Sequence, residues 1–140
     1  MDRGIDIDMS IRIAVATQDG NKVFGGHFAH AKKFRIFELD PESKKFNELE
    51  LRDNPLGNLP DFDDPHSAAE KFMELGIPLH GIPKYSWLKE NVLNDVDVIL
   101  CGGACQTSYQ FFMSEGVIVV FDDPGKEIAD SLKSLEKVIR

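Results

Sequence analysis

Several features that would define other classes of protein are missing from this 140-residue sequence. It has two cysteines, Cys101 and Cys105, which are too few for a disulfide scaffold and would stay reduced in a cytosol. No apolar run approaches the ~20 residues that span a bilayer. The start, MDRGIDIDMS, carries acids where a signal peptide would be apolar. We therefore expect a cytoplasmic protein without membrane association.

Positive charge is also scarce. Asp and Glu number 24 against 16 Lys and Arg, which gives a formal net charge of −8. The densest basic group is Lys32, Lys33 and Arg35, and an acidic chain without a basic face repels phosphate backbones. Nucleic acid is therefore not an expected partner. The sequence also contains no Walker A motif, G-x-G-x-x-G fingerprint or Ser-His-Asp arrangement that would indicate an enzyme class.

The length and composition fit one globular domain. A chain of 140 residues can bury roughly two thirds of the surface that it exposes when unfolded. A hydrophobic content of 42% with 29% charged residues is ordinary for a folded domain. Residues 1–10 are polar and precede the first strand pattern. We therefore divide the chain into an N-terminal extension, 1–10, and a single domain, 11–140.

The first half of the domain predicts three strands. Residues 11–17, IRIAVAT, are apolar almost throughout, as in a strand that is covered on both faces. Residues 33–40 and 45–53 show the period-two alternation of strands. Because the connections between these segments are short, we expect an antiparallel meander.

The second half alternates strand and helix patterns, which is typical of parallel units joined by crossovers. Buried strands are expected at 97–101 and 117–121. Helical spacing occurs in four segments, 67–76, 85–95, 105–116 and 124–139. A proline-containing break at 77–84 separates the first two of them. The predicted fold class is α/β, with a mixed five-stranded sheet, three strands antiparallel and two parallel, and helices on both faces.

This topology brings two distant segments to one edge of the sheet. The first, third, fourth and fifth strands all end there, and open α/β sheets bind ligands at the carboxyl ends of their parallel strands. The edge receives the loop KVFGGHFAHAKKF, 22–34, and the turn CGGAC, 101–105. We therefore expect four side chains with ligand chemistry to lie near one another: His27, His30, Cys101 and Cys105.

The turn CGGAC has a chemistry of its own. Gly102 and Gly103 allow a sharp turn from strand into helix and expose amide groups, which together with the helix N-terminus favour an anion. Cys105 lies in the first turn of that helix, where a thiol pKa is commonly lowered. Two roles are equally compatible with Cys105: a ligand, or a residue that simply begins the helix. For Cys101 the pattern favours the role of a small buried hydrophobic residue. The C-x3-C spacing does not match a structural zinc site.

His27 is the better ligand candidate of the two loop histidines. It directly follows Gly25 and Gly26, which make room for a close approach, and Phe28 is expected to anchor the loop. The alternative is a histidine whose ring is hydrogen-bonded to the loop backbone. His30 is a secondary candidate.

Taken together, several segments in order resemble the dinitrogenase iron-molybdenum cofactor biosynthesis family. They are RIAVATQDGNKVFGGHFAHAKKFRIFELD, DNP, the His-Gly at 80–81, DVDVILCGG, GVIVVF and GKEIADSL, and they cover residues 11–135. The resemblance implies a ribonuclease H-like α/β fold. It also implies binding, carriage or assembly of iron-molybdenum or related metal-sulfur clusters, without catalysis.

The resemblance also assigns positions. His27 matches the loop histidine of the family, His80 the histidine of the His-Gly pair, and Gly102 and Gly103 its glycine pair. Cys105 departs from the family, which commonly continues its glycine pair as GGIG, and around twenty extra residues appear before His80, at 57–79. The expected binding residues are then Gly26, His27, His80, Gly102, Gly103 and Cys105, with His27, His80 and Cys105 as metal ligands.

Expected partners are the metallocofactor and cluster-donor or cluster-acceptor proteins, with homodimerisation through an exposed sheet edge as an option. Two other functions stay open at this point. One is a regulatory or interaction module without metal, because the cysteines and His80 also have plausible structural roles. The other is a ribonuclease H-like metal-dependent nuclease, which the fold suggests but for which the first strand offers no carboxylate.

Overall fold

The computed structural model describes residues 11–58 and 81–138. The predicted extension at 1–10, the predicted helix at 67–76 and His80 lie outside the described residues. Among the described helices, none has the length and apolar character needed to cross a membrane.

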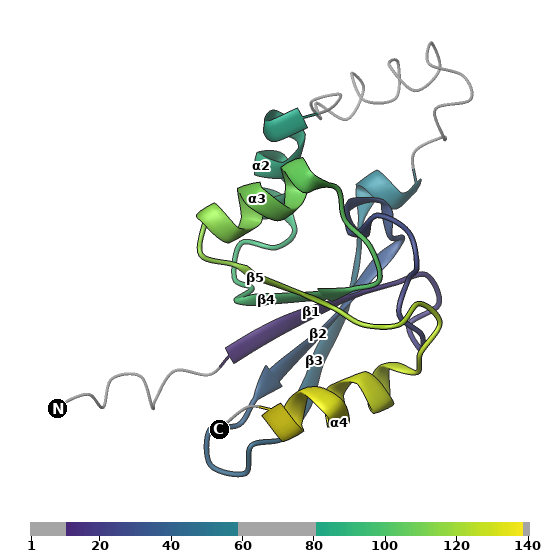
Figure 1. The fold of residues 1–140 in the computed structure, drawn as a ribbon, viewed down its shortest axis with the longest axis vertical. Helices are drawn as coiled ribbons and strands as arrows, with labels where there is room; N and C mark the ends of the chain where they lie inside the picture. The colour runs from purple at the N-terminus through teal and green to yellow at the C-terminus, as the bar shows by residue number, and fades with distance from the viewer. Residues whose placement is uncertain (1–10, 59–80, 139–140) are drawn as a thin grey trace, which may run out of the picture.

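The described residues form one mixed sheet of five strands in the order β3-β2-β1-β4-β5 (Figure 1). The strands β1, β2 and β3 form an antiparallel meander, and β4 and β5 run parallel to β1. The predicted fold class is therefore confirmed. The strands are β1 (Ile11–Thr17), β2 (Lys33–Leu39), β3 (Phe46–Asp53), β4 (Val98–Cys101) and β5 (Ile118–Phe121).

Helices cover both faces of this sheet, as predicted. The helices are α2 (Gly81–Asn91), α3 (Gln106–Ser114) and α4 (Ile128–Val138); α2 and α3 pack on one face and α4 on the other (Figure 1). Two 3-10 turns, η2 (Phe28–His30) and η3 (Pro55–Asn58), lie in the loops.

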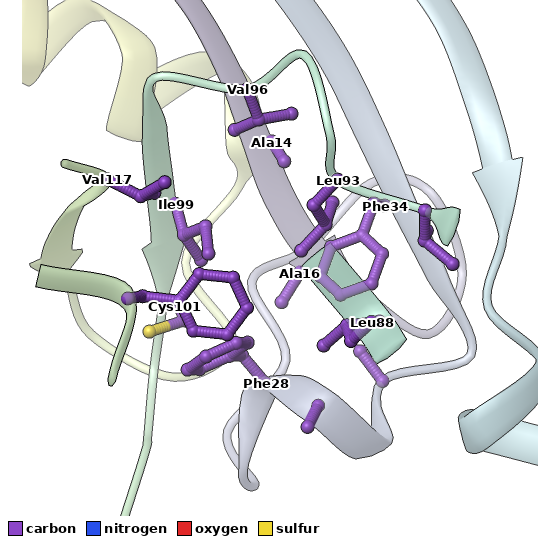
Figure 2. Packing of buried hydrophobic residues seen from close by; sticks show 14 of the residues in the cluster. Ala14, Ala16, Phe28, Phe34, Leu88, Leu93, Val96, Ile99, Cys101 and Val117 are labelled. Atoms are coloured by element: carbon purple, nitrogen blue, oxygen red, sulfur yellow. The ribbon is translucent and has the colours of Figure 1, made fainter. Parts of the chain in front are cut away.

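Each face has its own core because successive side chains of β1 point to opposite sides. Ala14 and Ala16 face α2 and α3, where Phe28 and Leu88 are fully buried (Figure 2). The opposite face buries another group, which includes Ile13, Val15, Val23, Leu100, Ile128 and Leu132. Alanines on one side of β1 leave room for the aromatic side chains that anchor the loop after this strand.

One predicted boundary was wrong. The break at 77–84 was expected to extend to Lys84, but α2 begins at Gly81, so residues 81–84 are helical. Pro83 lies in the first turn, where backbone N–H groups have no partner within the helix, so the missing N–H of proline costs little.

The loops after β1 and β3 are joined by Asn54. This side chain is fully buried, and its amide nitrogen donates to the carbonyl oxygens of Ala29 at 2.9 Å and Ala31 at 2.8 Å. Its side-chain oxygen accepts the backbone N–H of Leu56 at 3.2 Å. Asn54 thus fixes the η2 turn, and with it the neighbouring loop histidines, to the end of the third strand.

Replacing Asn54 by Ala should therefore destabilise the fold. The change leaves two buried carbonyls and one buried N–H without these partners, and we expect a loss of roughly 2–4 kcal/mol in the free energy of unfolding. Urea denaturation measures it. Asn91→Ala is the control, because Asn91 is exposed and makes one bond to Trp87; its effect should stay under ~0.5 kcal/mol. Equal midpoints for the two variants would contradict this role of Asn54.

Candidate functional site

The loop after β1 packs directly against the turn between β4 and α3. Gly102 donates its N–H to the carbonyl of Phe24 at 3.1 Å, and Phe28 donates its N–H to the carbonyl of Gly103 at 3.0 Å. A Cβ atom on Gly102 would lie 2.6 Å from the Phe24 oxygen, and one on Gly103 would lie 3.0 Å from the oxygen of Gly26. The glycine pair thus permits close contact between two loops, and the Gly102 amide is used within the protein.

His27 is held at this contact by its neighbours on both sides. Phe28 is fully buried and meets Phe112 edge to face, with ring centroids 5.4 Å apart, as predicted for an anchor. The His27 side chain caps the η2 turn, because its Nδ1 accepts the backbone N–H of Ala29 at 3.1 Å. Its ring stacks on Tyr85 of α2 at a centroid distance of 5.7 Å.

The surroundings of His27 keep its imidazole neutral. Burial lowers the pKa of His27 to about 4, and the positive charges of His30 and Lys84 act in the same direction. A neutral imidazole has one ring N–H, so one nitrogen donates while the other accepts. Neutral imidazole is also the form that binds metals.

Cys105 is the N-cap residue of α3. Its Sγ accepts the backbone N–H of Ser108 at 3.4 Å, and its own N–H donates to Ser108 Oγ at 3.2 Å, which completes a capping box. Partial burial alone would raise the pKa of the Cys105 thiol. Hydrogen bonds from Ser108, Tyr85 and the Thr107 backbone outweigh burial and lower that pKa below its ordinary value.

These side chains meet in one group, which we call the His-Cys cluster: His27, Tyr85, Cys105 and Ser108. The Tyr85 hydroxyl lies 3.3 Å from His27 Nε2 and 3.2 Å from Cys105 Sγ. Ser108 Oγ lies 3.3 Å from the same Nε2 and 3.4 Å from the same sulfur. The structure therefore brings two of the sequence-predicted ligands, His27 and Cys105, to the same two bridging hydroxyls.

Basic groups flank the His-Cys cluster. Lys84 is 3% exposed, and its Nζ lies 2.7 Å from His30 Nε2 and 5.8 Å from the centre of the Tyr85 ring. Burial lowers the pKa of Lys84, while the negative charge of Cys105 opposes this shift. His30, the secondary candidate, meets the His27 ring edge to face at 5.6 Å. The cluster thus places a thiol of lowered pKa near two basic side chains.

Cys101 does not belong to this group. It is fully buried in the core under α2 and α3 (Figure 2), and burial raises the pKa of its thiol to about 12. The interpretation as a small core hydrophobe agrees with this position.

Sequence reasoning missed Tyr85, Ser108 and Lys84. A usable signal existed for Ser108, because a side chain three residues after an N-cap commonly completes a capping box. Tyr85 was read as an ordinary position of a predicted helix, and Lys84 was placed in the break before it. Their approach to the His-Cys cluster depends on where α2 packs, which no local pattern encodes.

The described residues of the His-Cys cluster offer two side chains of the types that ligate metals. Within 11–58 and 81–138, no group of three or more His, Cys, Asp or Glu side chains could hold a metal ion. His27 and Cys105 supply one nitrogen and one sulfur donor. Two donors suit a cluster that brings its own sulfides, since such a cluster already fills most of the coordination positions of its metals.

Comparison with solved structures supports the fold. A structure described as "Crystal structure of PH0822" superimposes with a TM-score of 0.53 at 16% sequence identity, covering 91% of each chain. No curated protein matches the sequence. The family model described as "Dinitrogenase iron-molybdenum cofactor" matches residues 9–138. The resemblance noted in the sequence is thereby confirmed, and this chain belongs to the dinitrogenase iron-molybdenum cofactor family.

Proposed function

We propose that the protein binds and carries a metal-sulfur cluster or an iron-molybdenum-type cofactor, or helps to assemble one, without catalysing a reaction. Membership of the family associates the chain with the handling of such metal clusters. The observation that carries the proposal is the His-Cys cluster, in which a neutral imidazole and a thiol of lowered pKa share two hydroxyl partners.

The chemistry of this group suits an anionic cargo that contains sulfur. A thiolate is the usual protein ligand of iron-sulfur clusters, and histidine replaces it in some of them. The adjacent Lys84 would offset the negative charge that a cluster brings into a partly buried place. Gly26, Gly102 and Gly103 belong to the two loops that pack together beside the His-Cys cluster, where an added side chain would collide with atoms of these loops.

The candidate ligands are Cys105, His27 and His80, and the tautomer of His27 decides whether this histidine can ligate a metal. His80 directly precedes Gly81, the first residue of α2, and this helix also supplies Tyr85. A carrier of this kind would exchange its cargo with cluster-donor and cluster-acceptor proteins in the cytoplasm, as a monomer or as a homodimer. The identity of the metal in the cargo would depend on which cluster the donor proteins deliver.

A nuclease is less well supported. Two-metal nucleases need several carboxylates at the reacting centre. The strand β1 reads IRIAVAT and contains none, and the described residues hold no acidic group of metal-binding size. A metal-free regulatory module competes more seriously, since the His-Cys cluster is hydrogen-bonded internally.

Cluster uptake tests the proposal. The protein, purified without oxygen, is titrated with a synthetic cubane iron-sulfur cluster whose thiol ligands can exchange, and visible absorption and bound iron are measured. Cys105→Ala should weaken uptake at least about tenfold, because the ligand sulfur is gone. Cys101→Ala is the matched control and should take up the cluster like the wild type. No spectral change with the wild-type protein would contradict the proposal.

The reactivity of Cys105 gives a second prediction. Tyr85→Phe keeps the ring but removes a donor to Sγ, so the pKa of Cys105 should rise and the rate of alkylation by iodoacetamide should reach its plateau at higher pH. Tyr109→Phe is the control, because the Tyr109 ring stacks on Phe121 instead. Superimposable profiles for Tyr85→Phe and the wild type would show that this hydroxyl does not stabilise the thiolate.

A further inference from the structure

The orientation of the His27 ring carries information about which of its nitrogens can bind metal. Nδ1 accepts the N–H of Ala29, so its lone pair is directed at the backbone. The ring is also enclosed by aromatic neighbours, at centroid distances of 5.3 Å from Phe28, 5.6 Å from His30 and 5.7 Å from Tyr85. A flip of the ring would turn a carbon toward the Ala29 N–H and leave that donor without its partner.

This orientation fixes the tautomer. A neutral imidazole has one N–H, and because Nδ1 is the acceptor, the hydrogen is on Nε2. Nε2 lies 3.3 Å from the oxygens of both Tyr85 and Ser108. Ser108 donates its own hydroxyl hydrogen to the Cys105 carbonyl at 3.0 Å, so its oxygen can act as an acceptor, and the single Nε2–H is shared between the Ser108 and Tyr85 oxygens.

The hydrogen bonds then run in one direction, toward sulfur. Nε2–H donates to the Tyr85 oxygen, and the Tyr85 hydroxyl donates to Cys105 Sγ at 3.2 Å. The sulfur also receives the Ser108 N–H. As a thiolate, Cys105 is the final acceptor of this chain, and as a thiol it donates to Ser108 Oγ at 3.4 Å, whereas His27 in this tautomer directs no lone pair into the cluster.

We propose that His27 acts as a hydrogen-bond donor to the site and its sulfur-containing cargo, and that Cys105 alone of the described pair ligates the metal. This inference rests on the proposed function and narrows the ligand class. The cargo is a metal-sulfur species that exchanges one ligand for a protein thiolate and presents a sulfur atom, which replaces the Tyr85 and Ser108 oxygens as the acceptor of Nε2–H. The exchange forms one metal–Sγ bond and releases one external thiolate.

The alternative makes an opposite structural demand. For Nε2 to ligate a metal, the proton must move to Nδ1, and Nδ1–H would then face the N–H of Ala29. The η2 turn would lose its cap, so the Ala29 amide would become open to solvent exchange. The two roles of His27 therefore predict different states of the Ala29 amide: it is hydrogen-bonded if His27 is a donor and open to exchange if His27 is a ligand.

The first test needs no cargo. Nitrogen-15 NMR of the cluster-free protein identifies the protonated ring nitrogen of His27, and hydrogen exchange reports on the Ala29 amide. We expect Nε2–H and a protected Ala29 amide. A ring protonated on Nδ1, or an Ala29 amide that exchanges as fast as those of exposed loops, would overturn the inference.

The second test compares two variants with the synthetic cubane iron-sulfur cluster. His27→Gln keeps an amide donor and an acceptor but is a poor metal ligand, whereas His27→Ala keeps neither group. We expect His27→Gln to bind within about threefold of the wild type and His27→Ala to bind about tenfold more weakly. Asn47→Ala is the control and should match the wild type, because Asn47 is exposed on β3.

The outcomes separate the two proposals. If the wild type takes up the cluster and both His27 variants lose binding equally, His27 is a ligand, so the donor role is wrong while the carrier function stands. If the wild type takes up no cluster, the proposed function fails, and the assignment of a cargo contact to His27 fails with it.

Discussion

The candidate site depends on the close contact between the loop after β1 and the turn after β4. Two backbone hydrogen bonds join them, from Gly102 to Phe24 and from Phe28 to Gly103. The two loops can approach this closely only because position 102 is a glycine. A Cβ atom on Gly102 would lie 2.6 Å from the Phe24 oxygen. The contact sets the distance between His27 and α3. The approach of His27 to Ser108 in α3 depends on it.

Much of this arrangement could be predicted from the sequence because it is a consequence of chain direction. Short connections make β1, β2 and β3 a meander, and crossovers make β4 and β5 parallel to β1, so the carboxyl ends of four strands share one edge. His27 and Cys105 meet there through topology alone. Local patterns sufficed for this because they report strand periodicity and turn length.

The partners of His27 and Cys105 were beyond such reasoning. Tyr85 reaches the cluster because α2 begins at Gly81 and packs over the loop after β1, and helix packing angles are not written in local periodicity. Lys84 would pass for a surface residue by type, yet it is 3% exposed. His27 was predicted either as a ligand or as a histidine hydrogen-bonded to its loop; its Nδ1 is in fact bonded to the loop backbone, and its Nε2 faces the hydroxyls of Tyr85 and Ser108.

The two cysteines show how environment separates identical side chains. Cys101 ends a buried strand, and its thiol has no route to ionisation because burial opposes the charge. Cys105 follows four residues later, at a position where the family commonly has glycine. Its backbone there is extended, with φ −95° and ψ 165°, a conformation open to any residue, so cysteine replaces glycine without backbone strain. Cysteine at this position therefore adds a sulfur at the helix N-terminus, beside hydrogen-bond donors that lower the pKa of its thiol, without straining the backbone.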